Sequence, residues 1–196
     1  MKRTNFFQFT NGPKVTLPFT DNEYENRLKG LRKIIGENNL DVVILTSLQN
    51  IAYYSGFLYC SFGRPYACVV TAERNIVVSA NIDAGQPGRR CYGENIIYTD
   101  WERDNYFKAI ISLVKKVKRI GIEKDHLTME RYQNLKDALD DPETVDIAPL
   151  MHMLLHAVRF LFFVQQQFFG KHDHGFGNFF VIGSNLLPRP PQNITA

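Results

Sequence analysis

The spacing of apolar residues along the chain predicts three amphipathic helices. Each expected helix begins at a side chain that can cap it: Thr20, which Glu23 follows as in a capping box, then Asp104 or Asn105, then Thr128. The residues expected to face inward are, in chain order, Tyr24, Leu28, Leu31, Ile35, Phe107, Ile110, Ile111, Val114, Val117, Tyr132, Leu135 and Leu139.

Short runs of apolar and β-branched residues alternate with the expected helices and are typical of buried strands. They cover residues 41–47, 66–72, 75–80, 95–99, 119–123 and 143–147. Only Glu73 and Arg74 separate the second run from the third, which predicts a hairpin. Residues 1–19 are expected to form an irregular arm, residues 48–57 a connection with a turn at Ser55-Gly56, and residues 82–90 a glycine-rich loop or broken turn.

Helices alternate with strands around one hairpin in residues 1–150, which indicates one α/β domain. The expected fold is a mixed, mainly parallel sheet with helices on both faces. The pattern changes after about Met151, because residues 151–196 hold eight Phe and only four charged residues, and we expect a divergent Phe-rich tail. In that tail His172 and His174 lie two residues apart, which does not suit a closed zinc site without further ligands, so we expect no metal there.

The composition is that of a globular protein, since 44% of residues are hydrophobic and 22% are charged. The formal charge of +3 is small and the basic residues form no stripe, so we expect no nucleic-acid partner. No apolar run has the length of a signal peptide or a membrane span, which favours a cytoplasmic protein without a membrane partner. Cys60, Cys68 and Cys91 lack metal-like spacing and are expected to be reduced, mostly buried thiols.

Residues 1–150 contain no recognisable catalytic set. His126 is their only histidine, and no nucleophile–base arrangement, phosphate-binding loop or dinucleotide motif accompanies it. The carboxylates that cluster in sequence are Glu94, Asp100, Glu102 and Asp104. We expect them to lie in solvated turns and a helix cap, because acid–base chemistry would require two of them to converge with shifted pKa values.

The most informative stretch is Phe62-Gly63-Arg64-Pro65, which precedes an expected strand. A residue before proline favours extended backbone, and residues two apart in an extended segment point the same way, so Phe62 and Arg64 should share a face. A guanidinium matches a carboxylate and a Phe ring stacks on a planar cation, so the pair suits a small molecule carrying both groups. Gly63 between them would let such a ligand approach closely. Spacing alone favours a simpler alternative, a surface arginine beside a core phenylalanine.

Three blocks of sequence, residues 50–66, 82–110 and 118–126, resemble the N-terminal domain of creatinases, within the creatinase, prolidase and aminopeptidase P family. "NIAYYSGF" and "RIGIE" resemble the whole family, whereas "YCSFGRPY" and the block from "GQPGRR" to "TDWERDN" are closer to creatinases. The resemblance runs from about Phe9 to Met151. It implies a mixed sheet with helices on both sides, and the hydrolysis of creatine to sarcosine and urea without metal or other cofactor.

The resemblance also implies a role for Phe62 and Arg64 as substrate-binding residues that act across a homodimer. The Phe62 ring would line the pocket of the partner subunit, and the Arg64 guanidinium would hold the carboxylate of a creatine-like guanidino acid. No catalytic residue is expected in this chain. In the family, the catalytic histidine and carboxylates lie in a C-terminal domain of the pita-bread fold, which has no counterpart in this sequence.

We therefore expect a creatinase-like amidinohydrolase represented by its N-terminal domain, inactive alone and paired with a second copy or a full-length creatinase subunit. Two alternatives stay open. One is a non-catalytic binding or interaction module. The other is part of an Xaa-Pro peptidase of the same family, whose members hold a pair of metal ions in the catalytic domain.

Overall fold

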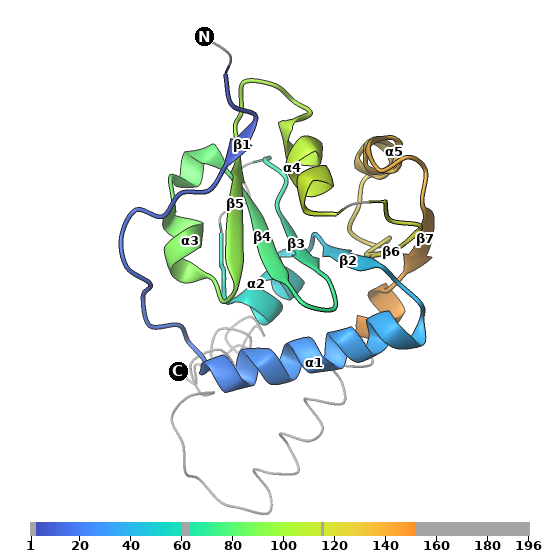
Figure 1. Ribbon diagram of the computed structural model, residues 1–196, viewed down its shortest axis with the longest axis horizontal. Coiled ribbons are helices and arrows are strands. Elements are labelled where there is room, and N and C mark those ends of the chain that lie inside the picture. The colour runs from blue at the N-terminus through green and yellow to red at the C-terminus, as the bar shows by residue number, and fades with distance from the viewer. Residues whose placement is uncertain (1–2, 60–62, 115, 152–196) are drawn as a thin grey trace, which may run out of the picture. The chain divides into compact units, whose positions relative to one another are not determined.

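A computed structural model of the chain describes residues 3–59, 63–114 and 116–151, which all lie in one compact unit, Met1–His156. Within these residues seven strands form one sheet in the order β1-β5-β4-β3-β2-β6-β7 (Figure 1). The strands are β1 (Phe6–Phe7), β2 (Val42–Leu45), β3 (Ala67–Val70), β4 (Asn75–Ala80), β5 (Glu94–Tyr98), β6 (Arg119–Ile122) and β7 (Glu143–Asp146). The helices are α1 (Asp21–Glu37), α2 (Leu48–Ser55), the 3-10 turn η1 (Asn81–Asp83), α3 (Gln86–Arg90), α4 (Asn105–Leu113) and α5 (Met129–Ala138).

The sheet is mixed, as the sequence predicts, although the described strands do not pair mainly in parallel. The pairs β4–β5, β2–β6 and β6–β7 are parallel, and the pairs β1–β5, β2–β3 and β3–β4 are antiparallel. Because β3 runs against both of its neighbours, its first residue lies at the same end of the sheet as the carboxyl ends of β2, β4, β5 and β6. This end, which we call the carboxyl edge, is where ligands bind in many open α/β sheets.

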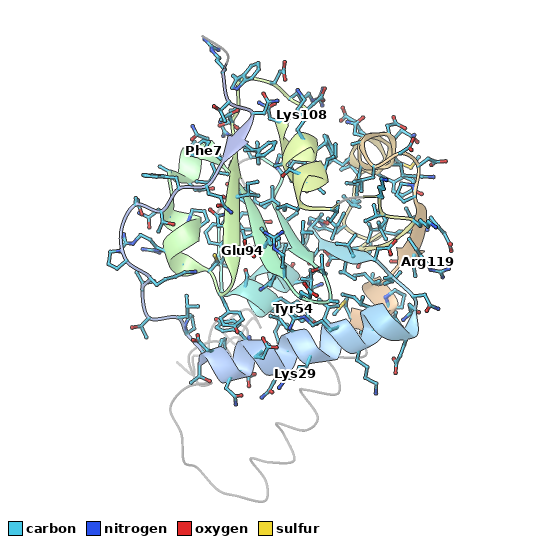
Figure 2. All side chains as sticks on the ribbon, viewed as in Figure 1. Phe7, Lys29, Tyr54, Glu94, Lys108 and Arg119 are labelled. Carbon is cyan, nitrogen blue, oxygen red and sulfur yellow. The ribbon has the colours of Figure 1, made fainter. Side chains whose placement is uncertain are left out.

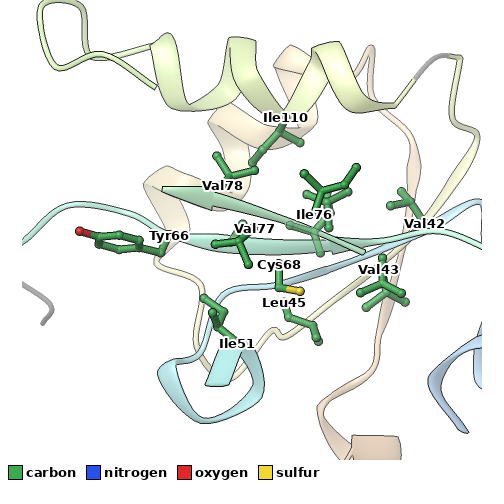
Figure 3. Close-up of a cluster of buried hydrophobic side chains, with 14 of the residues drawn as sticks. Val42, Val43, Leu45, Ile51, Tyr66, Cys68, Ile76, Val77, Val78 and Ile110 are labelled. Atoms are coloured by element: carbon green, nitrogen blue, oxygen red, sulfur yellow. The ribbon is translucent and has the colours of Figure 1, made fainter. Parts of the chain in front are cut away.

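Helices cover both faces of the sheet, which confirms the expected layers. Side chains of successive strand residues alternate between the faces. Ile76 and Val78 of β4 lie on the side of Ile110 of α4, whereas Val77 between them lies on the side of Ile51 of α2 (Figure 3). All five side chains are fully buried, so the core continues from α4 through the sheet to α2.

Two of the predicted helix starts are confirmed by their caps. The Thr20 hydroxyl accepts a hydrogen bond from the Glu23 amide at 3.3 Å, and the Thr128 hydroxyl accepts one from the Arg131 amide at 3.3 Å. Each bond satisfies an amide that has no partner inside the first turn of its helix. These caps define the starts of α1 and α5.

Three segments expected to be irregular contain regular structure. Residues 48–55 form α2, and Gly56 caps its end with a left-handed φ of +73°. Residues 82–90 contain the end of η1 and the whole of α3. Pro87 lies in the first turn of α3, where the missing amide hydrogen of proline costs no helical hydrogen bond. In the arm, β1 pairs with β5, and the Thr99 amide donates to the Asn5 carbonyl at 2.9 Å.

Helix α4 begins where the sequence predicts but is shorter than expected. Val114 caps its end with extended backbone, so Val117 lies beyond the helix. Ile111 is 37% exposed and does not face inward, whereas Tyr106, Phe107 and Ile110 are buried. The apolar face is therefore shifted by about one residue from the predicted one.

One arginine is buried at the start of the fold, in what we call the Arg27 cage, formed by Arg27, Phe19, Glu23 and Tyr53. Arg27 is 5% exposed, and its guanidinium lies 4.1 Å from the Phe19 ring centroid and 4.3 Å from that of Tyr53. Its Nε donates to Glu23 at 3.0 Å and its Nη1 to the Tyr53 carbonyl at 2.9 Å. Lys29 lies on the outer side of the same helix and is exposed (Figure 2).

Candidate substrate-binding edge

The carboxyl edge brings Arg64 next to Asp100. Arg64 lies just before β3 and Asp100 just after β5, so the topology places both at this end of the sheet. Arg64 Nε donates to Asp100 Oδ1 at 3.0 Å, and the two side chains are 35% and 36% exposed. This hydrogen bond raises the pKa of Arg64, which stays charged. The bond uses Nε alone, and Nη1 and Nη2 donate to no acceptor among the described residues.

The backbone at Gly63 is not extended, which corrects one step of the sequence reasoning. Its φ is +79°, in the left-handed region that favours glycine. Phe62 and Arg64 were expected to share a face because the segment between them would be extended, and that reason is wrong. The position of Phe62 lies outside the described residues. Among the described residues, the chain neighbours of Gly63 apart, no heavy atom lies within 4 Å of where its Cβ would stand, so the approach from this part of the domain is open.

A cavity of about 360 Å³ lies beside the Arg64–Asp100 pair. It is lined by residues of the 63–65 segment, the end of β5, and helices α4 and α5. Its charged lining residues are Arg64, Asp100, Glu102, Arg103, Glu130 and Arg131. A smaller cavity of about 80 Å³ shares Arg64, Pro65 and Arg131 with it. The larger volume is at the lower end of the range for small-molecule sites, so it suits a small polar ligand.

Buried tyrosines hold the backbone that carries Arg64. Tyr98 donates its hydroxyl to the Pro65 carbonyl at 3.0 Å, and Tyr106 donates to the Tyr66 carbonyl at 3.3 Å. Burial raises the pKa of Tyr98, with a further contribution from Asp100, and burial likewise raises the pKa of Tyr106. Both tyrosines therefore stay neutral and remain donors at neutral pH.

A buried carboxylate that the sequence did not single out supports the neighbouring part of the edge. Glu123, just after β6, is 2% exposed. It accepts hydrogen bonds from the Thr46 and Ser47 amides, from the Ser47 hydroxyl at 2.6 Å and from the Asn50 side-chain amide at 2.5 Å. It therefore satisfies donors at the start of α2 and fixes the junction of β2 with that helix. The only signal in the sequence was its place after the "RIGI" strand.

The carboxylates that cluster in sequence do not converge as an acid–base pair, and Glu94 lies at the amino end of β5, away from the carboxyl edge. Glu94 pairs with Arg74 at 2.8 Å, a bond that lowers the pKa of Glu94, and Glu102 pairs with Lys108. Asp100, Glu102 and Asp104 lie in exposed turns, as expected, and Asp104 directly precedes α4, whereas Glu94 lies in β5. Among residues 3–59, 63–114 and 116–151, no three His, Cys, Asp or Glu side chains lie together as a metal site would require. The described part therefore offers no fit for a metal pair.

A model of the Creatinase/Prolidase N-terminal domain matches residues 27–156. The chain belongs to this family. The match includes the Arg64–Asp100 pair, the Glu123 junction and every strand of the sheet except β1.

A curated relative within the family is the creatinase of Bacillus sp. (strain B-0618). It is 43% identical to this chain over 152 residues, which cover 76% of this chain and 37% of the creatinase. The chain thus spans well under half the length of that relative.

Solved structures similar to this one include a proline dipeptidase from Streptococcus pneumoniae TIGR4, with a TM-score of 0.60 and 19% identity over 65% of this chain and 96% of that one. An Xaa-Pro dipeptidase from Bacillus anthracis has a TM-score of 0.56 and 20% identity, over 67% of this chain and 35% of the dipeptidase. Both show that the mixed sheet and its helices form the fold of creatinase/prolidase N-terminal domains.

Three expectations from the sequence concern residues outside the described part. They are the placement of Phe62, the possible metal ligands His172 and His174, and the Phe-rich tail of residues 151–196, of which only Met151 is described. In the described part, Cys68 and Cys91 are buried and form no disulfide, as expected. None of the described helices has the length and hydrophobicity needed to cross a membrane.

Proposed function

We propose that this chain supplies the carboxylate-binding contact of a creatinase-like amidinohydrolase, the reaction being the hydrolysis of creatine to sarcosine and urea. Arg64 binds the substrate carboxylate, and Phe62 lines the pocket around the planar guanidinium. Both act in the active site of a partner subunit, which is a second copy of the chain or a full-length creatinase subunit.

The placement of Arg64 carries this proposal. Asp100 fixes the arginine through Nε and leaves the two terminal nitrogens directed to a possible ligand, and these nitrogens can bind a carboxylate with two parallel hydrogen bonds. The arginine is one-third exposed at the wall of a cavity, so a carboxylate can reach it. The 43% identity with a creatinase supports the guanidino acid as the class of substrate.

The chain's part in the reaction is binding and orientation. Attack of water on the guanidinium carbon requires a general base and an acid for the leaving amine. The described carboxylates at the cavity are held in ion pairs with arginine or lysine, so none of them is placed for that work. We propose that these groups belong to the partner's catalytic domain.

An Xaa-Pro peptidase role is the second candidate, because a dipeptide also ends in a carboxylate that Arg64 could bind. The two candidates differ in the cation, since creatine carries a delocalised guanidinium and a dipeptide carries a compact ammonium. The ring of Phe62 favours the planar cation.

A complementation experiment tests the proposal. A full-length creatinase subunit with alanine at the position aligned with Arg64 is mixed with this chain, and urea release from creatine is measured. We expect the wild-type chain to restore activity and an Arg64→Ala chain to fail, with the loss on the order of tenfold or more in kcat/KM. Equal activity with both chains would contradict the proposal. Release of proline from an Xaa-Pro dipeptide, without urea from creatine, would favour the second candidate.

A further inference from the structure

We propose that Arg131 is a second carboxylate-binding residue, which forms with Arg64 the anion-binding wall of the 360 Å³ cavity. The proposal deepens the function proposed above and rests on it for the identity of the ligand, a small carboxylate carried by a guanidino acid. Its own support comes from the charges, hydrogen bonds and position of Arg131.

The charges that line the cavity leave one cation without a carboxylate. Each lining acid is already in an ion pair: Asp100 with Arg64, Glu130 with Arg103, and Glu102 with Lys108. Within the described part of the chain, Arg131 has no carboxylate at ion-pair distance. The lining itself holds three arginines and three acids, but Lys108 pairs with Glu102 from outside the lining, so among the described residues Arg131 is left as the lining cation without a carboxylate. An anion is the ligand that would pair with it.

The hydrogen bonds of Arg131 leave most of its guanidinium available. Its Nη2 donates to the Gly63 carbonyl at 3.5 Å, which is a long bond, and its side chain makes no other hydrogen bond to described residues. A guanidinium carries five N–H donors. Arg131 is also half-buried, so water satisfies these donors less well than it would on an open surface. A carboxylate that accepts two of them would restore the missing partners.

The position of Arg131 makes it a neighbour of the Arg64 segment. It lies in the first turn of α5 and contacts the carbonyl of Gly63, the residue before Arg64. Arg64, Pro65 and Arg131 together line both the larger and the smaller cavity, so the two arginines share one wall. Two guanidiniums at one wall repel each other unless an anion lies between them. A carboxylate that accepts two parallel hydrogen bonds from Arg64 keeps a free lone pair on each oxygen, and Arg131 can donate to one of them.

The test measures binding by NMR titration of the full chain with two probes. Creatine carries the carboxylate, and creatinine is the matched probe that has the cyclised guanidine and no carboxylate. The variants are Arg131→Gln, Arg131→Lys and Arg64→Gln. Arg74→Gln is the control, since it removes the same charge from an arginine that pairs with Glu94 and lines neither cavity. Circular dichroism verifies that each variant is folded.

We expect creatine, and not creatinine, to bind the wild type and Arg74→Gln with equal affinity. Arg131→Gln and Arg64→Gln should each weaken creatine binding by about tenfold to a hundredfold. Arg131→Lys should lie between, because it keeps the charge and loses the planar fork.

Two results would overturn the inference in distinguishable ways. If Arg64→Gln weakens binding while Arg131→Gln binds creatine like the wild type, the second arginine has no role and the proposed function stands. If creatinine binds as well as creatine, or if neither arginine matters, both the inference and the carboxylate role of Arg64 are wrong. If no binding of creatine to this chain is measured, the inference about Arg131 is wrong, and the complementation experiment still decides the role of Arg64.

Discussion

Two regions of this domain place arginines in opposite surroundings. In the Arg27 cage the guanidinium is buried between two aromatic rings, and a carboxylate and a carbonyl accept its hydrogen bonds. At the carboxyl edge, Arg64 and Arg131 are partly exposed beside a cavity, and each makes one side-chain hydrogen bond to the described residues. The first arrangement leaves little for a ligand to contribute, whereas the second leaves donors that a ligand can use.

The difference shows how one residue type serves stability in one place and recognition in another. A buried cation must find its partners within the protein, because desolvation without them is costly. A recognition cation must keep donors open and still be held in place. Asp100 does this for Arg64 by binding Nε and leaving the terminal nitrogens to a ligand.

The largest expected effect is alkaline unfolding, which tests whether the open edge is as firmly packed as the closed interior. Burial raises the pKa of Tyr54 in the interior and of Tyr98 at the edge, and raises the pKa of Tyr59 to about 12. A raised pKa in the folded state means that the stabilisation is complete below the unfolded value, about 10. It is lost as pH rises through the folded values.

Each such tyrosine should lower the free energy of unfolding by about 1.4 kcal/mol per pH unit above 10, so the domain should unfold cooperatively near pH 11–12. Tyrosinate absorbance reports the ionisation of the tyrosines and circular dichroism reports the loss of structure, so the two signals are recorded together as a function of pH. Coincident transitions are expected. An absorbance change that precedes loss of structure would mean that the edge is looser than the interior.

A second comparison uses two glycines that have similar backbone angles but differ in the space available for an added side chain. Gly56 and Gly63 have φ of +73° and +79°. A Cβ at Gly56 would lie 2.5 Å from the hydroxyl of the buried Tyr24, whereas one at Gly63 would meet no atom within 4 Å from the described residues beyond its chain neighbours. We expect Gly56→Ala to cost about 3 kcal/mol of stability, from backbone strain and overpacking, and Gly63→Ala about 1 kcal/mol, from strain alone.

Urea denaturation of the two glycine variants measures the difference. Similar losses would show that crowding at Tyr24 is relieved by a small shift and that strain dominates at both sites. The Gly63 variant also tests the edge, since it should retain the fold and serve as a probe for ligand binding there.

The smallest of the three expected effects is the difference in stability lost when Arg27 or Arg131 is replaced. Arg27→Gln removes a buried cation from two rings and two acceptors, and we expect a loss of about 2 kcal/mol. Arg131→Gln removes a half-buried cation with one long hydrogen bond, and we expect less than about 0.5 kcal/mol. Thermal and urea unfolding of both variants provide the values. A larger loss at Arg131 than at Arg27 would reverse the roles assigned to the two regions.

The sequence predicted the parts of the fold that depend on local signals. Thr20 and Thr128 cap their helices as expected, and the hairpin at Glu73 and Arg74 joins β3 to β4. Helix α2 was missed because its start has Ser47 as a cap without a Glu or Gln three residues later. The carboxylate that satisfies this start is Glu123, 76 positions away from Ser47 in the chain, so no local pattern could show it.

The candidate site was predicted only as far as local sequence signals reach. Arg64 drew attention through its neighbours in sequence, Gly63 and Pro65, and the family resemblance then supplied its role. Asp100 was seen only as a turn carboxylate and Arg131 not at all. Their places beside Arg64 depend on how β5 and α5 are arranged around the sheet, which residue spacing does not encode.

Trp101 gives the domain a built-in optical reporter. It is the one tryptophan in the sequence, it follows Asp100 directly, and its indole nitrogen donates to the carbonyl of Thr4 at 2.9 Å. With 40% of its surface exposed, its emission is sensitive to solvent on one side and to the N-terminal arm on the other. Release of the arm and events at the neighbouring ion pair can thus be followed without attaching any dye.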